Sequence, residues 1–303
     1  MDLYYVCTLV MKRAIQHCLF FTALVFISLS GKAQQDHFWS KSELGFVIGG
    51  SYYIGDLNQF GHFKQNNLSG GLIYRYNYNS RVALRASLSY GKVEAYDSLG
   101  KTDYQLNRNL SFESTIFEGA LGFEFNYFNY KIGNDRYYAT PFLFAQIGVS
   151  RINPKAEYEG ELYELQPLGT EGQGSGLNSN STYNLTQLVV PMGFGFKINL
   201  GENVALQLEY GIRKTFTDYL DDVGDVYVNN VDLGSRNGDL AAALADRSSV
   251  LNVAGSKRGN PETKDWYSTF GIGLSISLGN PRRCAFMGDQ RRRKGKMRWW
   301  KYM

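Results

Sequence analysis

Apolar and polar residues alternate with a period of two along most of the chain. In the stretch NVALQLEYGIRK, residues 203–214, Leu206 and Leu208 fall on one face while Gln207 and Glu209 fall on the other. Such alternation indicates β-strands with one apolar and one polar face. It recurs in eight segments, each bounded by turn residues, at 43–54, 68–79, 81–91, 115–130, 136–151, 185–200, 203–214 and 265–278.

The connections between these segments alternate in length. The turns at 79–80, 131–136 and 201–202 are short, whereas the stretches 55–67, 92–114, 152–184 and 215–264 are long. Short turns on one side, long loops on the other and an even number of strands are typical of outer-membrane barrels. The pattern therefore predicts an all-β fold, an eight-stranded antiparallel transmembrane β-barrel similar in size to the OmpA and OmpX barrels, with four long external loops.

Two other all-β folds share this alternation, a soluble lipocalin-like barrel and a β-sandwich. A soluble barrel turns its apolar residues inward and carries many charges on its outer face. In this chain the apolar face is nearly free of charge, and the opposite face is small and mixed, with many glycine, alanine and serine residues. The composition of the two faces therefore favours a membrane barrel.

The charged residues on the small face balance, with four acids and four bases. Small residues suit the narrow interior of an eight-stranded barrel, which side chains fill. Buried charges must be paired, so we expect a network of ion pairs that plugs the lumen rather than an open pore. Its members are Glu43, Glu118, Glu124, Glu209, Arg75, Arg85, Lys197 and Arg213.

Aromatic residues gather toward the ends of the expected strands. They fit the interfacial girdles of a membrane barrel, although aromatic residues also favour strands in general. The expected girdle residues are Tyr52, Tyr53, Tyr74, Tyr76, Tyr78, Tyr90, Tyr127, Tyr130, Tyr137, Tyr138 and Trp266.

The glycine-rich stretch GGSYYIGDLN, residues 49–58, invites comparison with a phosphate-binding loop. Such a loop needs a following helix, whose N-terminal N–H groups bind the phosphate. The sequence that follows, QFGHFKQNN, has neither helical spacing nor a Lys-Ser/Thr pair. We expect instead that Gly49 and Ser51 face the lumen, that Tyr52 lies in the outer girdle and that the first external loop begins at Asp56.

The N-terminal region resembles a secretory signal peptide. A basic pair follows Met11, an apolar run extends from Leu19 to Leu29, and small residues precede Gln34. These are the three regions of a cleaved export signal, and the run is too short to span a bilayer as a helix. We therefore expect translation to start at Met11, cleavage after Ala33, a signal peptide at 1–33, a barrel at 34–280 and a tail at 281–303.

The C-terminal tail is strongly basic and contains the only cysteine outside the signal region. From Arg282 onward there are nine basic residues and one acidic residue, Asp289. Such a block is either a solvated tail or a docking segment for an acidic partner or lipid headgroups, and nucleic acid is not expected for an exported chain. Cys284 is either a free thiol or part of an intermolecular disulfide, and Arg282, Arg283 and Cys284 are candidate partner-binding residues.

The chain offers little for catalysis or cofactor binding. His37 and His62 are the histidines outside the signal region, and no Cys or His stands at metal-ligand spacing from them. His62 with Ser69 or Asp56 could imitate the catalytic group of a rim-active outer-membrane enzyme, but nothing in the sequence orients such a base. We therefore predict no enzyme activity, no catalytic residue, no cofactor and no metal site.

The longest connections suggest surface loops. The carboxylates of TDYLDDVGDVY, namely Asp218, Asp221, Asp222 and Asp225, could bind calcium, but their spacing does not match an EF-hand, and a solvated loop base is the favoured interpretation. Residues 168–184 are rich in Gly, Ser and Asn and are expected to be a flexible external loop. The stretch DLAAALADR within 215–264 is expected to form a short helix.

Two motifs together resemble the PorG family of Bacteroidetes. They are ELGFVIGGSYYIGDLN in the first expected strand and LEYGIRKTFTDYLDDV at the end of the seventh. The resemblance extends over roughly Glu43 to Leu278, which is essentially the whole expected barrel. The tail beyond Gly288 is not a recognised feature of that family.

The resemblance implies an outer-membrane β-barrel of the type IX secretion system, which exports proteins across the outer membrane and supports gliding. It also implies that the barrel holds a periplasmic ring, made of a lipoprotein and its partner subunit, against the outer membrane, with the C-terminus in the periplasm. Outer-membrane lipid and this ring are the expected partners. The alternatives left open by the residues are a small channel and a rim-active, lipid-modifying enzyme.

Overall fold

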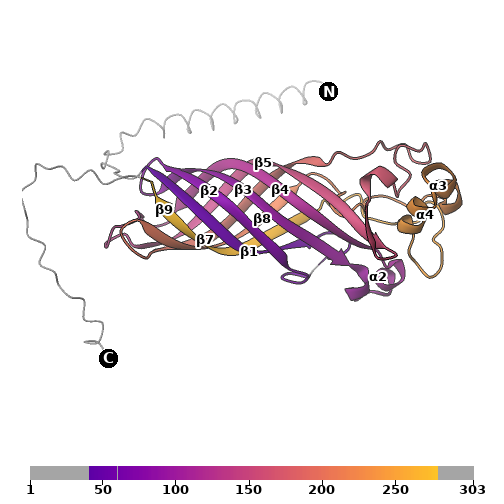
Figure 1. Ribbon diagram of the computed structural model, residues 1–303, viewed down its shortest axis with the longest axis horizontal. Helices are drawn as coiled ribbons and strands as arrows, with labels where there is room; N and C mark the ends of the chain where they lie inside the picture. The colour runs from indigo at the N-terminus through magenta and orange to yellow at the C-terminus, as the bar shows by residue number, and fades with distance from the viewer. Residues whose placement is uncertain (1–40, 60, 279–303) are drawn as a thin grey trace, which may run out of the picture. The chain divides into compact units, whose positions relative to one another are not determined.

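The chain closes an antiparallel β-sheet into a barrel (Figure 1). The computed structural model describes residues 41–59 and 61–278. In spatial order the sheet runs β4-β3-β2-β1-β9-β8-β7-β5, and pairing of β4 with β5 closes it without an open edge. The barrel strands are β1 (Ser42–Ile54), β2 (Asn67–Asn77), β3 (Val82–Tyr96), β4 (Ser111–Asn126), β5 (Ala139–Tyr158), β7 (Thr186–Asn199), β8 (Val204–Thr215) and β9 (Trp266–Ser277).

Shorter elements extend this barrel. The strand β6 (Glu161–Glu164) pairs only with the end of β5 and lies outside the closed ring. The helices and 3-10 turns belong to the connections; they are η1 (Asp97–Leu99), α2 (Asp103–Arg108), η2 (Gln166–Leu168), α3 (Asn230–Asn237) and α4 (Asp239–Ala245). Among the residues that the structure describes, no helix is long and apolar enough to cross a membrane.

The eight-stranded antiparallel barrel expected from the sequence is confirmed, but the bounds of three strands differ from the expected ones by more than two residues. β3 continues to Tyr96, β4 already begins at Ser111, and β5 continues to Tyr158. In these added segments the residues that face the inside are apolar and buried, such as Val93 and Phe112, and charged residues lie on the outer face. The apolar outer face that marks a strand in the sequence therefore ends before the strand itself does. The connection after β4 is also longer than expected, because β4 ends at Asn126.

The outer face of the barrel carries an apolar band. Large apolar side chains on every barrel strand point outward and are exposed, for example Phe46 at 54%, Phe123 at 64% and Ile147 at 67%. The residues between them face the lumen and are mostly polar or small. An apolar exterior around a polar interior is the arrangement of a transmembrane β-barrel, because only lipid tolerates such an outer surface.

The connections sort to the two ends of the barrel (Figure 1). Residues 78–81, 127–138 and 200–203 connect strands at the turn end, where β1 begins and β9 ends. The first loop (55–66), second loop (97–110), third loop (159–185) and fourth loop (216–265) lie at the opposite, loop end with α2, α3 and α4. The expected helix at DLAAALADR corresponds to α4, and α3 precedes it.

The loops are packed into the mouth of the barrel rather than standing free. An apolar core joins the extended parts of β3, β4 and β5 with Leu57 of the first loop, Leu165 of the third, and Leu220 and Val223 of the fourth. Leu220 is fully buried. Thr170 and the residues beside it are buried as well, so the expectation of a flexible external loop at 168–184 is wrong at its first residues, because they pack against the fourth loop.

The glycines of the opening motif serve close packing of strands. Gly49 pairs with Gly271 of β9, and a Cβ atom at Gly49 would lie 1.9 Å from the carbonyl oxygen of Phe270. Ser51 is buried and donates to the carbonyl of Lys92 at 2.7 Å. The interpretation of this stretch as a strand is therefore confirmed.

The aromatic girdle is smaller than expected. Tyr78, Tyr90 and several others are exposed on the outer face, but Tyr52, Tyr53 and Tyr130 are buried. Tyr53 faces inward, where its hydroxyl contacts carboxylates, and the first loop covers Tyr52. The girdle assignments of Tyr53 and Tyr130 are wrong, because tyrosine spacing alone does not show which side chains turn inward. Tyr52 does lie on the outer side of β1, where its hydroxyl contacts that of Tyr210 at 2.8 Å, but the first loop buries it.

Candidate functional site

The lumen of the barrel centres on the carboxylate of Glu124. It is fully buried and accepts from Arg75 Nε at 2.7 Å and from Arg85 Nη1 at 3.0 Å, and it also pairs with Lys197 Nζ. Arg75 and Arg85 stand directly opposite each other in the β2–β3 register. Like charges in that position repel each other, and the carboxylate of Glu124 offsets this repulsion by pairing with both guanidinium groups.

Further contacts extend this network along the lumen. Arg85 Nη2 donates to both oxygens of Glu209 at 2.9 Å. Toward the loop end, Glu118 accepts from Arg213 Nε at 3.3 Å and from the Tyr267 hydroxyl at 2.6 Å. The structure thus places all eight charged residues expected in the lumen on its inner wall and brings seven of them into ion pairs, while Glu43 accepts from Asn77 Nδ2 at 2.7 Å.

Side chains fill the space around these charges. The guanidinium of Arg85 lies 4.0 Å from the centre of the Phe144 ring, and Lys197 Nζ lies 4.7 Å from that of Phe142. A cavity of about 50 Å³ beside Arg85 and Glu118 has room for one or two water molecules. The lumen is a packed polar core at this level.

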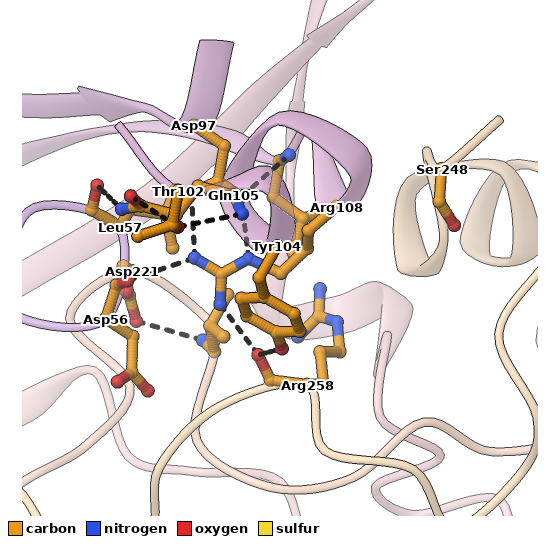
Figure 2. A network of polar contacts seen from close by, with 12 residues as sticks. Asp56, Leu57, Asp97, Thr102, Tyr104, Gln105, Arg108, Asp221, Ser248 and Arg258 are labelled. Carbon is orange, nitrogen blue, oxygen red and sulfur yellow. Dashed lines mark hydrogen bonds and ion pairs between the residues drawn. The ribbon is translucent and has the colours of Figure 1, made fainter. Parts of the chain in front are cut away.

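A second polar network ties the loops together, and Arg108 at the end of α2 is its centre (Figure 2). Its guanidinium donates to both carboxylate oxygens of Asp97 at 2.6 and 2.8 Å, a bidentate pair. It also donates to the carbonyl of Arg258 at 2.7 Å and to that of Asp56 at 3.0 Å. One buried side chain therefore connects the first, second and fourth loops.

Arg258 extends the same network to the third loop. Its Nη1 donates to Glu171 Oε1 at 2.9 Å and to the carbonyl of Asp222 at 2.6 Å, and its Nε donates to the carbonyl of Ala245 at 3.1 Å. Arg258 is 2% exposed, and Glu171 is fully buried. Arg108 and Arg258 thus join all four loops through one network of buried hydrogen bonds and ion pairs. We call the loops joined in this way the loop cap.

The carboxylates of the fourth loop lie inside the cap, so the expectation of a solvated loop base is wrong for Asp218, Asp221 and Asp222. The hydroxyl of Tyr53 contacts Asp221 Oδ2 at 2.6 Å and Asp265 Oδ1 at 2.7 Å. One hydroxyl proton cannot serve both contacts, so one of the two carboxyls must carry a proton. Burial, followed by repulsion from neighbouring carboxylates, raises the pKa of Asp221 well above its ordinary value.

Two neighbouring carboxyls are perturbed for the same physical reason. Burial raises the pKa of Asp218 to about 7 against the opposing attraction of Lys264, and no hydrogen bond satisfies either carboxylate oxygen of Asp218 within the described part of the chain. Burial likewise raises the pKa of Asp222 to about 6. Within residues 41–59 and 61–278, no group of three or more His, Cys, Asp or Glu side chains could hold a metal ion.

The residues considered for rim catalysis do not assemble. His62 Nδ1 lies 3.3 Å from the hydroxyl of Tyr52, on the outer side of β1. Asp56 accepts from the backbone N–H of Asn260 at 2.7 Å, and Ser69 lies on the inner face of β2. The signal peptide at 1–33, His37, and the tail with Arg282, Arg283 and Cys284 lie outside the described residues.

Sequence reasoning missed the loop cap. Arg108 and Arg258 lie in connections without any periodic pattern, and their partners are distant in sequence. One local signal was available, because Thr102 and Gln105 have the spacing of a capping box. The Thr102 hydroxyl accepts from the backbone N–H of Gln105 at 3.2 Å and starts α2, whose last residue is Arg108.

A family model covers most of the chain. The model described as a domain of unknown function (DUF6089) matches residues 17–242. The chain belongs to this family. The curated proteins include no match to this DUF6089 chain.

Solved structures of bacterial surface proteins are similar to this DUF6089 member at low identity. Neisserial surface protein A has a TM-score of 0.39 at 9% identity, covering 79% of this chain and 98% of that chain. Ail, the attachment invasion locus protein of Yersinia pestis, has 0.37 at 10%, covering 78% and 97%. OprG, an outer membrane protein from Pseudomonas aeruginosa, has 0.36 at 8%, covering 78% and 97%. The barrel fold itself is shown by the pairing and closure of the chain's own strands.

Proposed function

We propose that this chain is a non-enzymatic outer-membrane scaffold of the type IX protein secretion system, anchoring a periplasmic ring of a lipoprotein and its partner subunit. The main support for a scaffold role is that the barrel is closed twice, inside its lumen and over its mouth. Glu124 and its partners fill the lumen, and Arg108 and Arg258 lock the loops over its mouth. Such a barrel serves as a fixed attachment point rather than as a path for solute.

The assignment to this secretion system is more specific than the fold and comes from the two motifs that resemble the PorG family. The outer-membrane location is supported by the apolar band, since only a lipid environment accommodates it. Because β1 begins and β9 ends at the turn end, and turns face the periplasm in such barrels, the tail at 281–303 would start in the periplasm. There its basic residues would meet the ring.

The test is a deletion of residues 281–303 in the native host. We expect the truncated barrel to insert normally, which heat-dependent gel mobility of the folded protein reports, and secretion of cargo proteins to fall at least tenfold. A matched control replaces the tail by an uncharged segment of equal length. Normal secretion with the truncated barrel would remove the tail from the proposed function.

Cys284 offers a covalent test of the same proposal. As the only cysteine outside the signal region, it is the candidate for a disulfide to the ring lipoprotein. Non-reducing gels of the wild type are expected to show one heavy adduct that is absent from a Cys284→Ser variant and lost on reduction. Identical lanes would show that the attachment is not covalent.

The two alternatives make different predictions. A small channel would conduct in planar bilayers, which the packed charges around Glu124 oppose. A rim-active enzyme would lose turnover in a His62→Ala variant that still assembles, but His62 contacts the Tyr52 hydroxyl rather than a nucleophile and acid. Neither alternative gains support from the contacts around these residues.

A further inference from the structure

Basic side chains stand directly beyond the apolar band at the loop end of the barrel. Along the outward face of β5, Ile147 and Val149 are exposed at 67% and 54%, and the next outward residue is Arg151, also exposed. On the outward face of β8, the residue that follows Ile212 is likewise basic and exposed, Lys214. The strand β7 lies between these two strands.

Other basic residues near this level are neutralised by carboxylates. Lys92 Nζ of β3 lies 2.6 Å from Glu113 Oε2, and Lys155 Nζ of β5 lies 3.2 Å from Glu164 Oε1. They therefore present little free charge to the surroundings.

Arg151 and Lys214 have no such compensation. The cross-strand neighbours of Arg151 are Phe117 and Thr186, and those of Lys214 are Val190 and Trp266. No carboxylate pairs with either cation within residues 41–59 and 61–278. Two uncompensated positive charges therefore face outward at the edge of the apolar surface.

Aromatic rings hold Lys214 at this edge. Its Nζ lies 5.6 Å from the centre of the Trp266 ring and 5.9 Å from that of Phe216, which is 51% exposed. Aromatic residues favour the boundary between lipid tails and headgroups, and a lysine beside them extends its amine to the headgroups. The level of Lys214 along the barrel is thus the headgroup level of the surrounding leaflet.

We propose that the outer face of β5, β7 and β8 binds a phosphorylated, multiply acylated lipid of the leaflet at the loop end. Arg151 and Lys214 contact its phosphates, and the Thr186 hydroxyl, beside Arg151, donates to the same phosphate. The acyl chains lie on Val149 and on the exposed Leu188 of β7. This proposal rests on the outer-membrane location but not on a role in secretion.

The spacing of the two cations suits a headgroup that carries two phosphates. Arg151 and Lys214 lie on β5 and β8, which are two strand spacings apart, about 10 Å. Arg151 is opposite Thr186 of β7 and Lys214 is opposite Val190, so the two cations are also offset by about 13 Å along the strands. Two phosphates attached to a sugar headgroup therefore match the site better than one. Near a lipid surface, each cation contributes an attraction worth about fivefold in affinity.

The test measures lipid binding to the purified full-length barrel in mild detergent by native mass spectrometry. The probe is bisphosphorylated lipid A, compared with the same lipid after removal of both phosphates. We expect the wild type to prefer the phosphorylated probe and a double Arg151→Gln, Lys214→Gln variant to bind it about 25-fold more weakly. The matched control is Arg81→Gln, Arg136→Gln, which removes two exposed charges at the turn end and should bind like the wild type.

Three results would overturn the proposal. They are equal binding of the two probes by the wild type, an equal loss in both double variants, and full displacement of the lipid by millimolar inorganic phosphate, which would indicate an unspecific anion site. Heat-dependent gel mobility checks that each variant is folded. Because the readout does not involve secretion, a negative result leaves the scaffold proposal standing, and normal lipid binding with failed ring recovery would reject only the scaffold proposal.

Discussion

Replacement of Glu124 by glutamine is the perturbation that tests the filled lumen most sharply. Glutamine keeps the size of the side chain but removes the charge that neutralises Arg75, Arg85 and Lys197, all of them 0–1% exposed. Removing one partner of a buried ion pair costs about 3–5 kcal/mol, because the other charge stays buried. With three cations on one carboxylate, we expect a free energy of unfolding lower by about 4 kcal/mol.

The assay is urea unfolding of the barrel in phospholipid, followed by the gel mobility of unheated samples. Glu164→Gln is the matched control, since Glu164 pairs with Lys155 at the surface with half of its side chain exposed, and its loss should cost less than about 1 kcal/mol. Adding Lys197→Met to Glu124→Gln restores neutrality and should recover at least half of the loss. Equal stability of Glu124→Gln and the wild type would refute the reasoning.

Two further predictions concern the loop cap. Arg108→Ala leaves buried Asp97 without its bidentate partner, so limited proteolysis should cut the four loops at least tenfold faster, whereas Lys101→Ala, at an exposed position of the same loop, should have no such effect. The carboxyl of Asp218, with its pKa raised to about 7, stabilises the cap most below about pH 4 and loses this contribution as the pH rises through 7. Hydrogen exchange of residues 216–224, corrected for intrinsic rates, should therefore be faster at pH 8 than at pH 5. Asp218→Asn should reduce this difference but not abolish it, because the raised pKa values of Asp221 and Asp222 act in the same direction; equal corrected rates in the wild type would contradict this assignment.

The barrel could be predicted from the sequence because successive side chains of a barrel strand face lipid and lumen in turn. Lipid demands apolar residues outside, and the narrow lumen demands small or paired polar residues inside, so each strand carries the same signal. The placement of Glu124 on the inner wall followed from this alternation alone. The ends of β3, β4 and β5 were missed because there the outer face meets water, and the alternation changes from apolar outside to apolar inside.

The loop cap could not be predicted in this way. Arg108 and Asp97 are 11 residues apart, but Arg258 and Glu171 are separated by 87 residues in two different loops. No period relates such positions, and the closure of the barrel alone brings them together. The acidic stretch around Asp221 was read as solvated for the same reason, because local composition does not show that Tyr53 and the loops enclose it.

The most direct test of the central claim is affinity purification of the tagged protein from its native membrane in mild detergent, with and without reductant. The scaffold account requires recovery of a periplasmic lipoprotein and its partner subunit, in amounts that fall when residues 281–303 are deleted. A covalent fraction that disappears on reduction would in addition assign Cys284. Recovery of the barrel alone, from membranes in which the secretion machinery is intact, would contradict the account.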